Sequence, residues 1–471
     1  MQIQFHGAAE QVTGSCYLLT VNGTKVLLDC GMVQGNRLEE LRNADAFPFD
    51  PSAIDAVILS HSHIDHSGRI PFLVKSGFTG KIFTQKASRD LCRIMLKDAG
   101  YLNEREAEWE NKKRLRKGLD QVEPYFTVKD AQQAMTQFKG IEYGVTHKLS
   151  AGITFRFSDA GHILGSSIVE IWLTENSITK KIVFSGDIGY PNRPLLHDPA
   201  IIKNADLVLL ESTYGDRFHR TAEQTQAELT NIFCSANSEK GNVIIPAFAV
   251  GRTQRLLYEF VKNFEQWELD RWQIYLDSPM AISATEVYRK YTKLYDDDAA
   301  EIWNTDKTEA ILPNLKLSKT ANQSMQLNTI RSGAIIIAGS GMCTGGRIKH
   351  HLKHNAWRKD CHIVMTGFQA RGTPGRQLVD GSPHIRLWGE TVKVNAKLHT
   401  VGGLSAHADQ AGLINWYQHF DKTPPVILVH GEPPSLESLQ QALIKQTNAN
   451  VQIAKKSKTL NLLELDTLTF Y

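Results

Sequence analysis

Short apolar runs alternate with polar positions over about the first two hundred residues, a pattern typical of β-strands. Two runs rich in β-branched and aromatic residues, 15–20 and 24–29, flank Asn22-Gly23, which predicts an opening hairpin. Similar strand-like runs follow at 56–60, 152–158, 167–173, 181–185 and 207–210. We therefore expect a β-rich sandwich in this part of the chain.

Two segments of the same region have helical character. Residues 69–76 carry the apolar spacing of a helix that ends at Gly77. Residues 104–119 are heavily charged helix formers and include the basic run 112–117. We expect an exposed helix there, with a solvated charged face favoured over RNA contact.

Beyond about residue 214 the pattern changes to alternating helices and strands. The predicted elements of this region are the strands 242–246, 273–277 and 334–338 and a helix over 253–264. Such alternation indicates a parallel-sheet unit inserted into the first domain.

Short strands resume after residue 371 and end in the regions 426–429 and 459–470. The expected domain organisation is therefore a first domain over 1–213, an inserted domain over 214–370 and a return to the first domain over 371–471.

Composition fits a folded globular protein rather than a collagen-like, coiled-coil or disordered one, with 42% hydrophobic and 22% charged residues among 471. No apolar run approaches the roughly 20 residues that cross a bilayer, so no membrane span is expected. The N-terminal residues alternate like a strand and lack signal-peptide features, which favours a cytoplasmic location.

Charge and cysteine usage exclude two further kinds of site. The formal net charge of +3 gives no global attraction to polyanions, so any nucleic-acid contact must come from a local basic surface. The six cysteines lack C-x-x-C spacing, which argues against a disulfide framework and a thiolate zinc site. Buried free thiols are expected.

Four metal-capable side chains occur within six residues after the predicted strand 56–60: His61, His63, Asp65 and His66. On an extended backbone, His61, His63 and Asp65 would point to one side, and His66 would turn in as a helix begins. One ion could take His61 and His63, and a second ion Asp65 and His66. Imidazole with carboxylate suits Zn²⁺, and Mn²⁺ less well. The alternative, a polar loop that happens to be rich in histidine, is disfavoured by this density.

Each ion needs further ligands from distant sequence, and two other strand ends supply candidates. His162 stands between glycines in 160–166, and Asp187 stands between glycines in 184–189. Either residue alone would more often be a turn residue than a ligand. Beside a histidine-rich loop, both become good candidates.

At these residues the sequence resembles the metallo-β-lactamase superfamily, whose H-x-H-x-D-H motif matches residues 61–66. Asp29, His162 and Asp187 fall at other motifs of that superfamily. Glu211, His407 and His430 are similar to motifs A, B and C of its β-CASP subgroup of RNA nucleases, relatives of the pre-mRNA 3′-end cleavage subunit. The resemblance covers nearly the whole chain and implies an α/β fold: an αββα sandwich with an inserted α/β β-CASP domain.

The resemblance also implies roles for individual residues. One Zn²⁺ would take His61, His63 and His162, and the other Asp65, His66 and His430. Asp187 would bridge the two ions and share in catalysis by holding a metal-activated hydroxide between them. Asp29 is better placed to fix the tautomer of a ligand imidazole than to bind an ion, although a strand-end turn aspartate is the alternative.

Catalysis needs a proton donor for the leaving oxygen of a phosphodiester. By the resemblance, His407 is the expected general acid, and Glu211 would hold it in the charged form. Otherwise Glu211 would be a helix-entry residue and His407 a surface residue. Substrate contacts are expected from five residues in or near other family blocks: Arg252, Ser340, Arg347, Arg371 and Ser405.

The expected function is a zinc-dependent ribonuclease that acts on single-stranded RNA, as an endonuclease with a further exonuclease activity left open. Two alternatives remain: the same dinuclear site acting on DNA or a small ester, or a non-catalytic RNA-processing partner. The inserted unit argues against small substrates, and the complete set of motifs argues against an inactive partner. The sequence leaves homodimer formation open.

Overall fold

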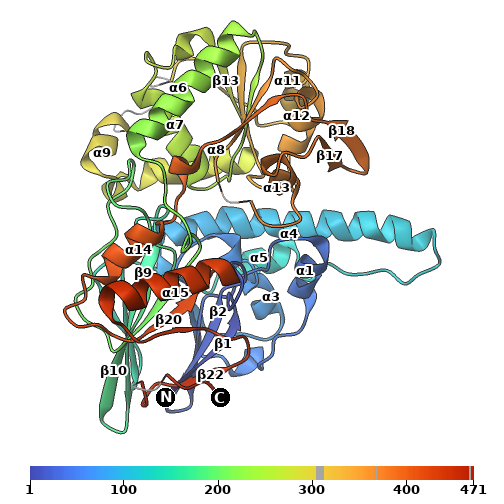
Figure 1. Ribbon diagram of the computed structural model, residues 1–471. Helices are drawn as coiled ribbons and strands as arrows, with labels where there is room; N and C mark the ends of the chain where they lie inside the picture. Colours follow the sequence, from blue (N-terminus) through green and yellow to red (C-terminus); the bar gives the residue numbers. More distant parts are fainter. Residues whose placement is uncertain (304–311, 368, 466–467) are drawn as a thin grey trace. The chain divides into compact units, whose positions relative to one another are not determined.

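Alternating apolar residues of the first two hundred positions are buried between two seven-stranded sheets (Figure 1). This computed structural model describes residues 1–303, 312–367, 369–465 and 468–471. The chain forms two units. The first contains Met1–Arg193, Asp198–Phe218 and His407–Tyr471, and the second contains Pro194–His197 and His219–Ala406.

The first sheet of the first unit has the strand order β22-β1-β2-β3-β4-β5-β6. Its strands are β1 (Gln2–Gly7), β2 (Cys16–Val21), β3 (Thr24–Leu28), β4 (Ala56–Ile58), β5 (Lys81–Gln85), β6 (Phe138–Ile141) and β22 (Thr459–Asn461). β1 to β3 pair antiparallel and β3 to β6 pair parallel, so the predicted hairpin is the antiparallel β2–β3 pair.

The second sheet has the order β21-β20-β11-β10-β9-β8-β7. Its strands are β7 (Thr146–Ser150), β8 (Ile153–Asp159), β9 (Ser167–Glu175), β10 (Ile178–Phe184), β11 (Leu207–Glu211), β20 (Val426–Val429) and β21 (Val451–Ile453). Strands β10, β11, β20 and β21 run parallel to one another.

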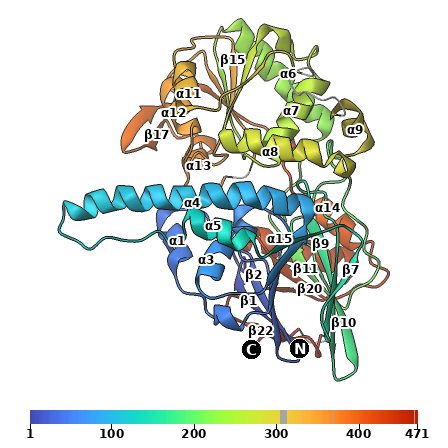
Figure 2. The ribbon, with the colours of Figure 1, turned by 180° about the vertical axis from the view of Figure 1, so that it is seen from behind.

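Helices cover the outer face of each sheet, which completes the expected αββα sandwich. α3, α4 and α5 pack on the first sheet, and α14 and α15 on the second (Figure 2). The helices of this unit are α1 (Arg37–Leu41), α2 (Ile64–Ser67), α3 (Ile70–Lys75), α4 (Lys86–Leu115), α5 (Val128–Met135), α14 (Gln410–Tyr417) and α15 (Pro433–Thr447).

The second unit is built on a parallel six-stranded sheet of order β14-β13-β15-β12-β16-β19, which confirms the inserted α/β fold. Its strands are β12 (Val243–Pro246), β13 (Gln273–Asp277), β14 (Leu315–Leu317), β15 (Ala334–Ala338), β16 (His362–Met365) and β19 (Lys397–Thr400), with a separate hairpin of β17 (His384–Leu387) and β18 (Glu390–Lys393). Its helices are α6 (Ala222–Ser238), α7 (Arg252–Lys262), α8 (Pro279–Lys290), α9 (Asp297–Trp303), α11 (Ala321–Leu327), α12 (Ile348–Asn355) and α13 (Pro374–Val379).

Three expectations differ from the structure. The chain returns to the first unit at His407 and not at residue 371, because β19 pairs with β16 in the sheet of the second unit. The helix expected over 104–119 begins earlier, as α4 at Lys86. In the region 459–470 the named strand is β22, and residues 466–467 lie outside the described part of the chain.

Two expectations from composition can be compared with the described residues. None of their helices combines the length and apolar character that a bilayer span requires. All six cysteines are free, and five of them are buried, but Cys234 is exposed because it lies on a solvent-facing position of α6.

Candidate metal centre

Metal-capable side chains follow the carboxyl ends of strands in both sheets of the first unit. β4 leads into the segment 61–66, β10 into Asp187, and β20 into His430, while His162 lies in the loop between β8 and β9. Carboxyl ends of parallel strands meet at one edge of a sheet, where loops supply functional groups. The sandwich therefore brings these loops together although they are far apart in the sequence.

The histidine-rich segment is extended only as far as His63. α2 begins at Ile64, so Asp65 lies in the first turn of a short helix and not on an extended backbone as expected. The backbone of this helix is held from two sides: Ser15 N donates to Asp65 O at 2.8 Å, and Cys30 N donates to His66 O at 2.8 Å.

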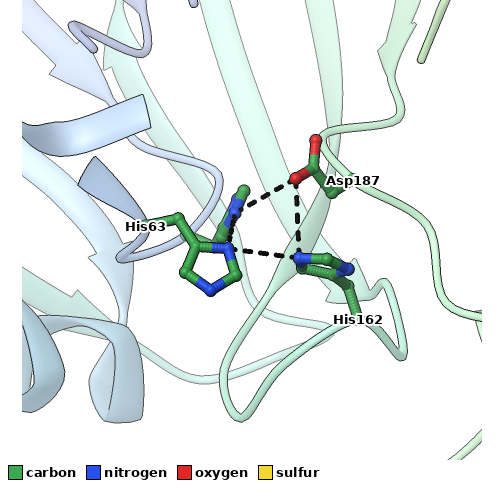
Figure 3. A group of neighbouring side chains, drawn as sticks. His63, His162 and Asp187 are labelled. Carbon is green, nitrogen blue, oxygen red and sulfur yellow. Dashed lines mark hydrogen bonds and ion pairs between the residues drawn. The ribbon is translucent and has the colours of Figure 1, made fainter. Parts of the chain in front are cut away.

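A first group of ligand atoms consists of His61 Nε2, His63 Nδ1, His162 Nε2 and Asp187 Oδ2 (Figure 3). His63 Nδ1 lies 3.1 Å from His61 Nε2 and 3.2 Å from His162 Nε2. Asp187 Oδ2 lies 3.4 Å from His61 Nε2 and 3.5 Å from His162 Nε2.

A second group consists of Asp65 Oδ2, His66 Nε2, His430 Nε2 and the other oxygen of Asp187, Oδ1. His66 Nε2 lies 3.0 Å from His430 Nε2 and 3.3 Å from Asp187 Oδ1. His430 Nε2 lies 3.5 Å from Asp65 Oδ2 and 3.6 Å from Asp187 Oδ1. Asp187 thus turns one oxygen to each group.

Both groups fit a zinc ion. Ligand atoms about 2.0–2.2 Å from a tetrahedral ion are roughly 3.3–3.6 Å from one another, close to the spacings of both groups. Asp187 Oδ1 is buried without a hydrogen-bond partner among the described residues, although a buried carboxylate oxygen normally has one. Imidazole and carboxylate donors without thiolate are a set that suits zinc.

The protonation states favoured by the surroundings also suit metal binding, which needs neutral imidazoles and charged carboxylates. Burial and then the neighbouring His61 lower the pKa of His63 to about 3. Burial raises the pKa of the Asp187 carboxyl, but His430 and His66 outweigh it, so the pKa lies well below its ordinary value. For His66, Asp187 and Asp29 overcome burial and raise the pKa, so a positive charge is favoured at that position.

A network of polar side chains orients two of these imidazoles from behind. Asp29 Oδ2 lies 2.7 Å from His66 Nδ1 and accepts from Ser60 Oγ at 3.0 Å and Ser15 Oγ at 2.9 Å. Ser60 Oγ also lies 3.1 Å from His61 Nδ1. These contacts leave the Nε2 atoms of His61 and His66 directed at the ligand groups. Asp29 therefore lies where the sequence predicts it, while Ser15 and Ser60 were not anticipated.

Glu211 forms a second such network at the end of β11. Its Oε1 accepts from Ile188 N at 2.7 Å, beside Asp187, and its Oε2 accepts from Thr213 Oγ1 at 2.6 Å. Thr213 Oγ1 in turn lies 3.0 Å from His430 Nδ1. Sequence reasoning missed Thr213, although a hydroxyl two residues beyond a strand-end glutamate was a usable signal.

His407 lies against the same glutamate. Its Nδ1 is 3.1 Å from Glu211 Oε2 and 3.9 Å from Asp187 Oδ2, and its ring centroid is 4.4 Å from that of His162. Burial lowers the pKa of His407, but Glu211 and Asp187 outweigh this effect and raise it above the ordinary value. An imidazolium beside the ligand groups can donate a proton. Glu211 and His430 also form a third candidate group with Asp187.

The five expected substrate-binding residues belong to the second unit. Arg347 donates to Asp277 Oδ1 at 2.7 Å and to Ser318 O at 2.9 Å, a geometry that favours a structural role. Ser340 Oγ accepts from Gly345 N at 3.2 Å within the glycine-rich loop. Arg252 opens α7, Arg371 is exposed in a turn, and Ser405 follows a short 3₁₀ turn.

His399 is close to His407 in sequence but takes no part in either ligand group. It lies on β19, and its Nε2 is 3.0 Å from His362 Nδ1 on the adjacent β16. Sequence distance alone could not separate this strand pair from the candidate site.

Three family models match the chain. The metallo-beta-lactamase superfamily matches residues 9–123, the Beta-Casp domain matches 253–378, and the Zn-dependent metallo-hydrolase RNA specificity domain matches 391–454.

Whole-chain relatives cover nearly the same length. A protein named ribonuclease TTHA0252 of Thermus thermophilus is 38% identical over 443 residues, which are 94% of this chain and 96% of that protein. An RNase J-like protein of Methanocaldococcus jannaschii is 30% identical over 91% of this chain and 92% of its own. The transcription termination factor FttA of the same organism is 29% identical over 92% and 67%.

A solved structure of a protein of unknown function from Enterococcus faecalis V583 has a TM-score of 0.54 at 13% identity. It covers 98% of this chain and 99% of its own. This likeness concerns the fold alone.

Proposed function

Because the chain belongs to the metallo-β-lactamase superfamily, in the group with β-CASP and RNA specificity domains, we propose that it is a zinc-dependent ribonuclease. It would hydrolyse phosphodiester bonds of single-stranded RNA, as an endonuclease and with a capacity for exonucleolytic cutting. The observation that carries the proposal is Asp187, whose two oxygens face two groups of zinc-type ligand atoms.

Two ions are proposed, one for each group. His61, His63, His162 and Asp187 would hold the first, and Asp65, His66, His430 and Asp187 the second. When bound, such a pair supplies a lowered pKa for water and neutralises charge on phosphate oxygens. The carboxylates of Asp65 and Asp187 offset part of the added positive charge.

The chain's own contribution begins with orientation. The hydrogen of His66 Nδ1 points to Asp29, and that of His61 Nδ1 points to Ser60, so both rings present Nε2 lone pairs to the ligand groups. His430 donates from Nδ1 to Thr213, whose hydroxyl donates to Glu211. Each contact fixes a tautomer and a ring angle before substrate arrives.

His407 is the proposed general acid. Glu211 engages its Nδ1, so the proton for the leaving ribose oxygen would come from Nε2. The same carboxylate stabilises the imidazolium and holds the backbone of Ile188 next to Asp187. One glutamate therefore orients the acid and the residue shared by both ligand groups.

The test is to incubate the purified protein with 5′-labelled single-stranded RNA and DNA of the same sequence, with chelator and with zinc restored. We expect RNA cutting that stops on chelation, returns with zinc and is absent in Asp187→Asn. Internal fragments would indicate endonuclease action, and a ladder from one end exonuclease action. Cutting that resists chelation would refute the proposal, and a preference for DNA would assign the site to a deoxyribonuclease.

A further inference from the structure

A cavity of about 200 Å³ lies in the first unit, and its lining contains none of the ligand-group residues. It is bounded by the end of β1, the loop after β3, the segment 42–49, Arg69 at the start of α3, and residues 456–457. One water occupies about 30 Å³ of liquid, so the space is large enough for a tetrahedral anion with attached groups.

Three cations line this cavity: Arg42, Arg69 and Lys456. Asp45 also lines it, but among the residues that the structure describes no carboxylate oxygen lies within ion-pair distance of any of the three. Burial, and then Arg42, lower the pKa of Lys456, as expected where like charges are crowded. The lining therefore carries excess positive charge without a matching anion.

Arg69 is held in a fixed orientation. Its guanidinium carbon lies 4.1 Å from the ring centroid of Phe47, which stacks on Phe49 at 5.3 Å, and its Nη2 donates to the carbonyl of Asp45. Its Nε is buried without a hydrogen-bond partner in the described part of the protein. A guanidinium fixed on an aromatic ring, with a donor still to be satisfied, is prepared for a bidentate anion.

His6 supplies a second, independent indication. Both ring nitrogens are buried without hydrogen-bond partners among the described residues, and the ring lies 5.2 Å from Phe49. Burial and then Lys456 lower the pKa of His6 to about 4, so the ring is neutral near pH 7. Unpaired buried polar atoms are costly, and a ligand that accepts one hydrogen bond from this imidazole would recover part of that cost.

We propose that this cavity is a phosphate-binding site. Arg42, Arg69 and Lys456 supply the positive charge, His6 supplies a neutral donor, and Phe47 and Phe49 form an apolar wall against which an attached ribose or base can pack. The phosphate could come from the inorganic ion, a nucleoside monophosphate or RNA. The site does not depend on the proposed ribonuclease activity.

Lysine footprinting by mass spectrometry tests this with a residue-level readout. The zinc-loaded protein is treated with an amine-reactive reagent alone or with inorganic phosphate, adenosine 5′-monophosphate, or phosphorothioate RNA with and without a 5′-phosphate. At about ten times the Kd the site is about 90% occupied, so modification of Lys456 should fall about tenfold. The adjacent Lys455, which does not line the cavity, should be unaffected.

The pattern of protection identifies the source. Protection by the inorganic ion or the monophosphate assigns a small free phosphate, and protection by RNA alone assigns an RNA phosphate. If none of the probes protects Lys456, or if Lys455 is protected equally, the proposal is overturned.

Arg42→Gln should weaken the protection of Lys456 about tenfold through loss of one charge-assisted contact, whereas Lys455→Gln should not change it. Melting temperature and zinc content verify that both variants fold. Equal affinity in wild type and Arg42→Gln would contradict the assignment. Because zinc content and RNA cutting are measured separately, failure here is distinguishable from failure of the ribonuclease proposal.

Discussion

Glu211 contacts more of the candidate site than a strand-end carboxylate needs to. It accepts from Ile188 N and Thr213 Oγ1 and faces His407 Nδ1, so its loss would disturb an acid, a ligand loop and an imidazole tautomer together. Replacements of His407 and Glu211 separate these roles at the level of single residues.

Removal of His407 should slow the reaction and leave the metal bound. His407→Ala is expected to lower kcat by about 10²–10⁴-fold, since a positioned general acid contributes that range. Its zinc content should match the wild type, because His407 belongs to neither ligand group. Single-turnover RNA cutting and metal analysis on the same sample measure both quantities.

His419→Ala is the matched control for that variant. His419 is in the same unit and lies 2.8 Å from the carbonyl of Asn415, away from the ligand groups. Loss of zinc in His407→Ala would place His407 among the ligands, and unchanged cutting would remove it from catalysis.

Glu211→Gln should change the pH dependence of cutting. A general acid works in its protonated form, so the rate falls as pH rises through its pKa. Glu211 helps raise the pKa of His407 in the wild type, and a neutral amide removes that effect. The descending limb of the kcat profile should therefore shift to lower pH in Glu211→Gln.

Two controls accompany that profile. The zinc content of Glu211→Gln should stay at the wild-type value, since a drop would make Glu211 a ligand. A uniform loss of rate without a shift would mean that Glu211 does not act through His407.

At the scale of elements, the ligand groups depend on close backbone approach between the β3 loop and α2. A Cβ on Gly31 would lie 1.6 Å from the carbonyl oxygen of Asp65 and 2.8 Å from His66 N. Real side chains cannot take that position, so only glycine lets the loop and the helix that carries two ligands meet.

Gly31→Ala should therefore separate the loop from α2. We expect a loss of about 1–3 kcal/mol in the free energy of unfolding, typical of overpacking, together with weaker zinc binding. Denaturant unfolding and competition with a zinc chelator measure the two effects.

Gly402→Ala provides the comparison, because a Cβ there meets no atom within 4 Å. It should leave both quantities unchanged. Normal zinc affinity in Gly31→Ala would contradict the proposed dependence on this contact.

The elements that the sequence predicts well are those with a clear period. Alternation located β2 and β3 within a residue or so, and α3 was located equally well. The first half of α4 was missed because its buried positions, among them Leu91, Met95 and Leu96, face the sheet and carry no charge pattern. The boundary at residue 371 differed because strands β17 to β19 carry no mark of the unit to which they belong.

At the scale of the whole molecule, the candidate ligand residues were available from motif spacing, but their partners were not. Ser15, Ser60 and Thr213 are ordinary strand-end residues until the sheets bring them to Asp29, His61 and His430. Backbone conformation was equally hidden: Asp29 and His430 have φ of 59° and 53°, which non-glycine residues adopt only where surrounding structure enforces it.

The most direct test of the account is the number of zinc ions bound per chain, measured by elemental analysis of dialysed, folded protein. Two ligand groups that share Asp187 predict about two ions in the wild type and about one in His63→Ala and in His430→Ala. Wild-type protein that holds no zinc, or variants that keep the wild-type number, would contradict the account.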